Sequence, residues 1–226
     1  MGIEKNPADF LPSDVEAVVA SEWNYAARYN RQSEPRAILL AGQPGAGKTV
    51  LSSMLNKLLC GNVYFINADE YRRFHPNYKE LYARYGSVSV QMTSGFSGAV
   101  TERLIHETSE RGIHLIIEGT GRTTDVPHRT AELLVKKGYR VELAVIATRP
   151  EHSLCSTLLR FYEMNERGTI PRATAMEAHD YVVRVLPDNL DILRDDPVIS
   201  GITIWDRTPT KIYDSCGTAE CPSEVL

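Results

Sequence analysis

The stretch Gly42-Gln43-Pro44-Gly45-Ala46-Gly47-Lys48-Thr49 decides the fold class of this chain. It matches the pattern GxxxxGK[ST], in which glycines let the backbone curl so that successive N–H groups point at phosphate oxygens. Lys48 is expected to reach the β- and γ-phosphates of a nucleotide, and the Thr49 hydroxyl to ligate Mg²⁺. A helix that begins near Lys48 directs the positive end of its dipole at the same anion. The pattern therefore predicts that all eight residues bind ATP or GTP.

Short apolar runs and periodic helical patterns alternate on both sides of this loop. The runs predict strands at 37–41, 63–66, 113–117, 141–147, 202–205 and 211–213. Helical patterns cover 13–28, 49–59, 97–111, 127–137, 151–166 and 173–194, and Ser13 is expected to cap the first of these helices. Strands that alternate with helices predict βαβ units, right-handed crossovers and a parallel sheet covered by helices on both faces. The expected fold class is an α/β P-loop NTPase or kinase.

The length of 226 residues fits one α/β domain with a short extension. Residues 1–34 are expected to form an N-terminal helical extension and 35–214 the P-loop kinase domain. Residues 215–226 are small and polar, which predicts a disordered tail.

Composition narrows the partners. The net charge of −4 gives no overall attraction for nucleic acid or for an anionic membrane, so neither is expected as a partner. The four cysteines are scattered without a CxxC pair, which indicates no disulfide framework and no zinc site. The N-terminal segment lacks the apolar core of a signal peptide, and a cytoplasmic location is expected.

The second predicted strand ends in Ile66-Asn67-Ala68-Asp69. Ligands of open parallel sheets gather beyond the carboxyl ends of the strands, so Asp69 should project toward the γ-phosphate. A carboxylate at this position can accept the proton of an attacking hydroxyl and act as a general base. The alternative is that Asp69 only caps the helix that follows.

The third predicted strand runs into Glu118-Gly119-Thr120-Gly121-Arg122. Glu118 occupies the place of a carboxylate that orients Mg²⁺ or its water shell, and Arg122 is a candidate anion contact. The alternative for Glu118 is a structural pair with a nearby arginine. Further on, Arg160 and Arg172 are candidates for lid arginines that contact the transferred phosphoryl group, although a single arginine is otherwise a solvated surface residue.

The remaining titratable residues carry no metal signal. His75, His128 and His179 are far apart and lack the spacing of metal ligands. They are expected on the surface or in loops.

The chain resembles the zeta toxin family, including its pneumococcal relatives, from about residue 38 to residue 213. The string Glu118–Pro127 is the most specific part of this resemblance. It is accompanied by Gly42–Thr49, by Asn67-Ala68-Asp69 with His75-Pro76-Asn77-Tyr78, by Arg160, and by Pro171-Arg172-Ala173-Thr174 with His179-Asp180. The resemblance implies a kinase of UDP-N-acetylglucosamine that phosphorylates the 3′-hydroxyl of the amino sugar, and thereby a toxin that blocks cell-wall synthesis.

The resemblance also assigns roles to residues. It implies that Asp69 is the general base, that Lys48 acts in catalysis, and that Arg160 and Arg172 bind the triphosphate. The substrate side is implied to comprise Glu102, Glu118, Thr120, Arg122 and Thr130. A small helical antitoxin protein that occludes the nucleotide site is implied as a partner. Asn67 departs from the family pattern, because relatives often carry Asp there, which leaves one acidic group fewer near Mg²⁺.

Three other readings compete with this one. The acceptor could be another small hydroxylated metabolite or an antibiotic. The chain could also be an NTP-binding switch or scaffold without an acceptor, because the phosphate loop alone does not define a reaction. A polynucleotide kinase needs a basic groove with stacking aromatic residues, and the acidic net charge argues against it.

Overall fold

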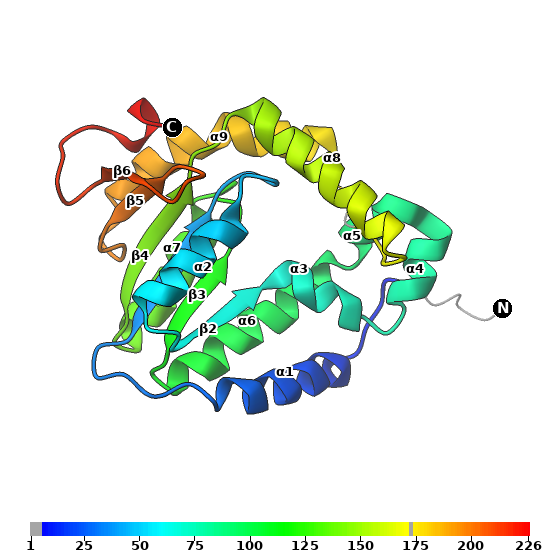
Figure 1. The fold of residues 1–226 in the computed structure, drawn as a ribbon. Helices are drawn as coiled ribbons and strands as arrows, with labels where there is room; N and C mark the ends of the chain where they lie inside the picture. Colours follow the sequence, from blue (N-terminus) through cyan, green and yellow to red (C-terminus); the bar gives the residue numbers. More distant parts are fainter. Residues whose placement is uncertain (1–5, 172–173) are drawn as a thin grey trace.

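The computed structural model describes residues 6–171 and 174–226. Within them a sheet of six strands has the order β2-β3-β1-β4-β5-β6 (Figure 1). The strands are β1 Arg36–Ala41, β2 Val63–Asn67, β3 His114–Glu118, β4 Arg140–Ile146, β5 Ile202–Trp205 and β6 Lys211–Asp214. Strands β1 to β5 pair in parallel, as predicted, whereas β6 runs antiparallel to β5. The expectation of a parallel sheet therefore fails at this one edge.

The turn between β5 and β6 explains the reversal. The Asp206 side chain accepts hydrogen bonds from the backbone N–H groups of Thr208, at 2.8 Å, and Thr210, at 2.9 Å. A connection this short joins only antiparallel neighbours, because a parallel strand requires a long crossover.

Helices cover both faces of the sheet, as predicted. The helical segments are α1 Pro12–Ala26, α2 Lys48–Leu58, α3 Ala68–Tyr71, η1 Arg72–Phe74, α4 Tyr78–Tyr85, η2 Gly86–Val88, α5 Ser89–Met92, α6 Ser94–Glu110, α7 Asp125–Lys136, α8 Pro150–Glu166, α9 Met176–Arg194 and η3 Pro222–Glu224. Helices α1 and α6 lie side by side, and α8 runs from the end of β4 toward α4 and α5 (Figure 1). Every helix in the described residues is too short or too polar to traverse a lipid bilayer.

Alternating side chains of the strands build two cores. Ile38 and Leu40 of β1 face α2, where they pack with Leu51 and Leu55. Leu39, on the opposite side of the same strand, belongs to the larger core under α1, α6, α7 and α9. Because both faces of β1 are buried, the strand is apolar from Ala37 to Ala41, as expected for a strand covered on both sides.

Helix α1 begins differently from the prediction. Leu11 is its N-cap residue and Pro12 its first residue, so Ser13 lies inside the helix. The Asp14 carboxylate accepts the backbone N–H of Leu11 at 2.8 Å. Proline suits a first helical position because its missing N–H would have no partner there. The capping assignment of Ser13 is therefore wrong.

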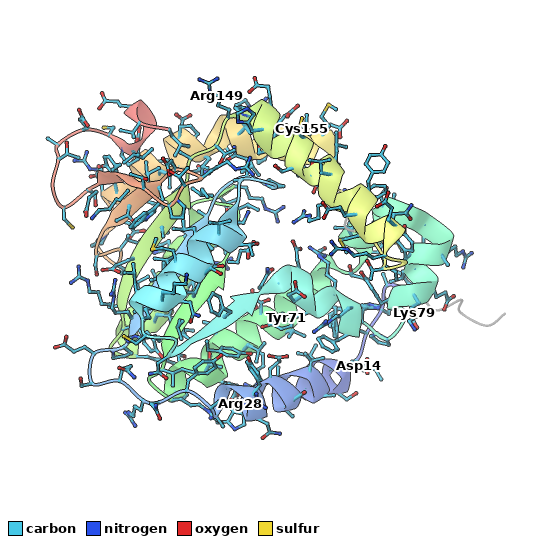
Figure 2. The ribbon with its side chains drawn as sticks, viewed as in Figure 1. Asp14, Arg28, Tyr71, Lys79, Arg149 and Cys155 are labelled. Atoms are coloured by element: carbon cyan, nitrogen blue, oxygen red, sulfur yellow. The ribbon has the colours of Figure 1, made fainter. Side chains whose placement is uncertain are left out.

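The segment 68–93 forms short helical pieces for which the sequence pattern gave no prediction. Tyr71 of α3 is buried between α3 and α6 (Figure 2). His75, expected on the surface or in a loop, lies in the turn after η1 but is only 2% exposed. Its Nδ1 accepts the backbone N–H of Asn77 at 3.1 Å, and its Nε2 lies 3.2 Å from the carbonyl of Ala8. The histidine is therefore a structural residue that ties the chain before α1 to this segment.

Residues 215–226, for which the sequence predicts disorder, instead fold against α9. Pro222 is buried, and Val225 packs on the larger core. The backbone N–H and the hydroxyl of Ser223 both donate to the Asp191 carboxylate, at 3.0 and 2.6 Å. The prediction of disorder from polar composition is wrong, because polar groups of this segment form hydrogen bonds with α9.

Candidate active site

The loop between β1 and α2 places a lysine amine at the start of a helix. Gly47 is the N-cap residue of α2 and has a φ of 106°, which glycine adopts without strain. The Lys48 amine donates to the carbonyls of Gly42 and Gln43, at 2.8 and 3.3 Å, so the side chain lies folded over the loop. Thr49 follows on the first turn of α2 and is exposed. A helix N-terminus with an adjacent ammonium group is suited to binding a phosphate.

The segment that follows β4 fixes the shape of this loop. The Thr148 hydroxyl donates to the carbonyl of Ala46 at 2.7 Å, and the Gln43 side-chain amide donates to the carbonyl of Thr148 at 2.6 Å. A Cβ on Gly45 would collide with the carbonyl of Ser153. Pro44 is half-buried in the same loop. The loop therefore packs directly against the first turn of α8.

A buried polar chain continues from the loop through α8 to α9. The Gln43 amide lies 3.4 Å from the Ser153 hydroxyl, and that hydroxyl lies 2.7 Å from Nε2 of His179. Nδ1 of His179 lies 2.9 Å from the carboxylate of Asp180. His179 lies in α9 and is 0% exposed, so its predicted position on the surface or in a loop is wrong. The chain links three segments that are far apart in sequence.

Glu118 ends β3 next to the lysine. Its Oε1 lies 3.9 Å from the Lys48 amine, and its Oε2 accepts a hydrogen bond from the Asn67 side-chain amide at 2.9 Å. The strand-end position predicted for a Mg²⁺-orienting carboxylate thus lies beside the phosphate loop.

Asp69 lies on the first turn of α3. The side-chain carbonyl of Asn67 accepts the backbone N–H of Asp69 at 3.0 Å, so Asn67 caps the helix. The Asp69 carboxylate instead contacts Nε of Arg72 at 2.9 Å, and this side chain is 49% exposed. The alternative in which Asp69 serves as the helix cap does not describe the structure.

Electrostatic effects at Lys48 show which charged groups converge. Burial lowers the pKa of Lys48, because the charged amine loses hydration. The carboxylates of Glu118 and Asp69 oppose this change and raise the pKa, whereas Arg160 lowers it further. Four predicted site residues from α2, β3, α3 and α8 therefore share one electrostatic environment.

The other predicted residues lie at different distances from this cluster. The carbonyl of Thr120 accepts the backbone N–H of Gly42 at 3.4 Å, which places the β3–α7 loop beside the phosphate loop. Arg122 is exposed in the same loop, and Thr130 is half-buried on α7. Glu102 is exposed in the middle of α6. Arg172 lies outside the described residues.

Sequence reasoning missed Arg207. Its NH2 group donates to the Ser156 hydroxyl of α8 at 3.3 Å, and its Nε lies 3.8 Å from the point where a Cβ on Gly47 would stand. The available signal was its position: a basic residue directly after the last parallel strand reaches the same sheet edge as the phosphate loop.

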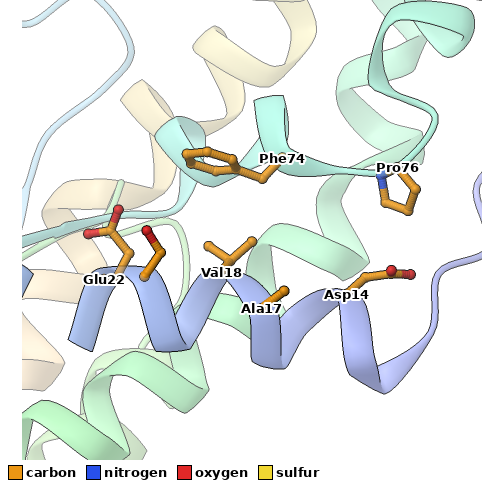
Figure 3. Close-up of a pocket in the computed structure, with 7 residues that line it drawn as sticks. Asp14, Ala17, Val18, Glu22, Phe74 and Pro76 are labelled. Carbon is orange, nitrogen blue, oxygen red and sulfur yellow. The ribbon is translucent and has the colours of Figure 1, made fainter. Parts of the chain in front are cut away.

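A groove elsewhere on the molecule has no role in this arrangement. It lies between α1 and η1 and has a volume of about 370 Å³ (Figure 3). It is lined by Asp14, Ala17, Val18, Ser21, Glu22, Phe74 and Pro76. None of these is a predicted site residue, and none belongs to the phosphate loop.

The oxygen donors of the site fit a magnesium ion that arrives with a nucleotide. Among the described residues no group of three or more His, Cys, Asp or Glu side chains is placed to hold a metal by itself. Mg²⁺ is ordinarily bound by one or two protein oxygens together with phosphates and water. The Thr49 hydroxyl and the Glu118 carboxylate are ligands of this class.

Comparison with known sequences gives a consistent result. The sequence model of the zeta toxin family matches residues 20–218. The chain is 40% identical over 220 residues to Toxin PezT of Streptococcus pneumoniae serotype 4, covering 96% of this chain and 87% of that protein. It is 40% identical over 194 residues to Toxin zeta of Streptococcus pyogenes, covering 85% of this chain and 68% of the relative.

Solved structures show the same fold. A structure of the PezAT chromosomal toxin–antitoxin system of Streptococcus pneumoniae superimposes with a TM-score of 0.88 at 37% identity, over 98% of this chain and 88% of that one. The AvrRxo1-ORF1:-ORF2 complex with ATP superimposes with a TM-score of 0.62 at 16% identity, over 92% and 68%. The second similarity extends to the fold alone.

Proposed function

The chain belongs to the zeta toxin family, and on this premise we propose that it is a kinase that transfers the γ-phosphate of ATP or GTP to an alcohol. The observation that carries the proposal is that Glu118 lies 3.9 Å from the Lys48 amine on the phosphate loop, while the charges of Asp69 and Arg160 also act on this amine. A phosphate cradle alone would suit a switch or a motor. A carboxylate whose charge acts on the loop lysine, here Asp69, supplies what a kinase needs in addition, because it can accept the proton of an acceptor hydroxyl.

The proposed reaction uses these side chains as follows. The acceptor oxygen forms a bond to the γ-phosphorus while the bond from that phosphorus to the β–γ bridging oxygen breaks. Asp69 takes the proton of the acceptor, and the nucleoside diphosphate leaves with the bonding electrons. Lys48 and Arg160 neutralise charge on the phosphoryl oxygens, since preorganised cations are worth most where charge develops. Arg172 is proposed for the same task by family resemblance.

Thr49 and Glu118 are the residues that would hold Mg²⁺. The ion, when bound, supplies charge neutralisation on the β- and γ-phosphates.

We propose the 3′-hydroxyl of the amino sugar of UDP-N-acetylglucosamine as the acceptor, which makes the protein a toxin directed at cell-wall synthesis. Support comes from the family resemblance of the acceptor side, comprising Glu102, Glu118, Thr120, Arg122 and Thr130. Another small hydroxylated compound is the second candidate, because exposed residues such as Glu102 and Arg122 leave the acceptor side open to variation.

An antitoxin protein is the proposed partner. Support comes from the PezAT toxin–antitoxin structure, whose toxin fold this chain shares over nearly its whole length. A partner that covers Lys48 and the first turn of α2 would stop nucleotide binding and so silence the enzyme.

The decisive experiment incubates the protein with ATP, Mg²⁺ and UDP-N-acetylglucosamine and follows the sugar nucleotide by mass spectrometry. The expected product carries one additional phosphate. Asp69→Asn is expected to slow transfer about 10²-fold or more, the usual range for losing a general base. Asp188→Asn, at an exposed position on α9, is the matched control. Nucleotide hydrolysis that no acceptor stimulates would favour the switch or scaffold reading instead.

A further inference from the structure

We propose that Arg72 is a positioning residue for Asp69. Its Nε holds the Asp69 carboxylate, while a second nitrogen of the same guanidinium donates to the carbonyl of Val90. The inference rests on the proposed function, because it assumes that Asp69 receives the proton of the acceptor. Arg72 is the first residue of η1, directly after the single turn of α3 that carries Asp69.

The grip on Asp69 is a charge-assisted hydrogen bond. Nε of Arg72 lies 2.9 Å from Oδ1 of Asp69. The Asp69 side chain is 49% exposed and stands on a helix of only four residues, so packing contributes little to its orientation. The Asn67 cap fixes the backbone of Asp69, whereas Arg72 restricts rotation of the carboxylate itself. Kinase chemistry needs such restriction, because a small misplacement of a reacting group costs much of the rate.

The anchor of Arg72 lies on the other side of its guanidinium. NH1 donates to the carbonyl of Val90 at 2.6 Å and lies 3.4 Å from the Thr93 hydroxyl. Thr93 is 0% exposed, and its hydroxyl donates to the carbonyl of Ser89 at 2.9 Å. The Arg72 side chain is only 17% exposed, so it is held more firmly by its surroundings than the half-exposed Asp69 side chain. A planar fork of several donors is suited to holding two partners at once.

The geometry links the base to the acceptor side of the molecule. Val90 belongs to α5, which leads directly into α6, the helix that carries Glu102. One guanidinium thus joins Asp69 to the segment 86–93. The charged groups that act on Lys48 of α2 are Asp69 itself, Glu118 of β3 and Arg160 of α8. None of these is altered in the test below.

The ion pair between Arg72 and Asp69 contributes more to positioning than to stability. An ion pair whose carboxylate is half exposed is screened by water and adds little to the free energy of unfolding. Loss of the Arg72 guanidinium should therefore appear in turnover and not in nucleotide binding, since Lys48 and the loop are untouched.

The test compares Arg72→Gln, Arg72→Lys and the control Arg73→Gln. Arg73 is the neighbouring exposed arginine of η1, stacked at 4.8 Å over the ring of Phe74. Arg72→Gln is expected to lower kcat about 10- to 100-fold, with the KM for the nucleotide unchanged. Arg72→Lys should recover part of kcat, because an ammonium keeps the charge but not the fork. Arg73→Gln should behave as wild type.

An unchanged kcat in Arg72→Gln, or an equal loss in Arg73→Gln, overturns the proposal. If Arg72→Gln does not fold, the kcat of Arg72→Lys decides in the same way. Hydrogen exchange of the amides in 86–93, measured without any acceptor, provides an independent readout: it should accelerate in Arg72→Gln. If the wild type transfers phosphate to no acceptor, the proposed function fails. In that case, unaltered hydrogen exchange of 86–93 in Arg72→Gln would separately overturn the proposed link between Arg72 and this segment.

Discussion

Asn67 and Glu118 stand opposite each other in the register of β2 and β3, and the Asn67 amide donates to the Glu118 carboxylate at 2.9 Å. The same side chain accepts the backbone N–H of Asp69 through its carbonyl oxygen. An amide offers both a donor and an acceptor here, whereas an ionised carboxylate only accepts. Asn67 therefore joins two acidic residues of the site without adding a third negative charge.

Replacing this amide by a carboxylate should make the site dependent on cations. Asn67→Asp keeps the cap of α3 but faces Glu118 with a like charge, and we expect a loss of about 1–3 kcal/mol of unfolding free energy without metal. Added Mg²⁺ should restore part of this loss, because the ion favours clustered carboxylates. Thermal unfolding with and without Mg²⁺ measures the effect. Asn24→Asp, exposed on α1, should show neither change, and equal behaviour of the two variants would contradict the argument.

Removal of the buried amine should separate function from stability. The lowered pKa of Lys48 shows that burial disfavours its charged form. Lys48→Met is therefore expected to leave the melting temperature of the nucleotide-free protein unchanged or raise it, while nucleotide affinity falls about 10²-fold or more. Calorimetric titration with ATP and Mg²⁺ checks the affinity. Lys57→Met, at the exposed end of the same helix, should bind normally. A marked fall in the melting temperature of Lys48→Met would count against this account.

The close approach of the phosphate loop to α8 should exclude any side chain at Gly45. Its φ of +77° already disfavours other residues, and an added methyl group would strike the carbonyl of Ser153. Gly45→Ala is expected to cost about 3 kcal/mol from overpacking and to abolish nucleotide binding. Gly138→Ala is the control, because Gly138 has a φ of +83° and nothing within 4 Å of its added Cβ. Chemical denaturation should therefore show a penalty of only about 1 kcal/mol for Gly138→Ala, against the larger penalty for Gly45→Ala.

Acid should weaken the sheet through His114. Burial, and next the charge of Arg36, lowers the pKa of this histidine, whose Nδ1 accepts the backbone N–H of Arg36 at 2.9 Å. The unfolded chain then binds the proton more readily than the native chain, so stability falls as the pH drops below about 6.5. His114→Gln should lose less stability across this window, as followed by denaturant midpoints at several pH values. His106→Gln, at an exposed site on α6, should retain the wild-type slope.

The fold was largely predictable because its signals are local. The glycine loop and the continuous apolar run of β1 are each recognisable from a few consecutive residues. The direction of β6 and the position of the C-terminal segment depend on hydrogen bonds of Asp206 and Asp191, which composition does not reveal. The segment 68–93 escaped prediction because helices of one or two turns are too short to show a period.

The candidate site was predictable in part for the same reason. Lys48, Glu118 and Asp69 follow strand ends, and parallel strands bring such positions to one edge of the sheet. The burial of His179 and the contact of Arg207 with Ser156 could not be predicted from the sequence. Each depends on how α8 packs against a segment remote in sequence, which only the tertiary structure defines.

The contacts from Gln43 through Ser153 to His179 restrict the movement of α8 relative to the phosphate loop. The first turn of α8 is held against the phosphate loop. Thr157, one turn further on, is also buried against Gly45, so a hinge in this helix would have to lie beyond Thr157. Arg160 lies three positions further along the same helix. The contacts of α8 with the phosphate loop thus lie in the first half of the helix, and any displacement of Arg160 relative to that loop requires bending of the helix beyond Thr157.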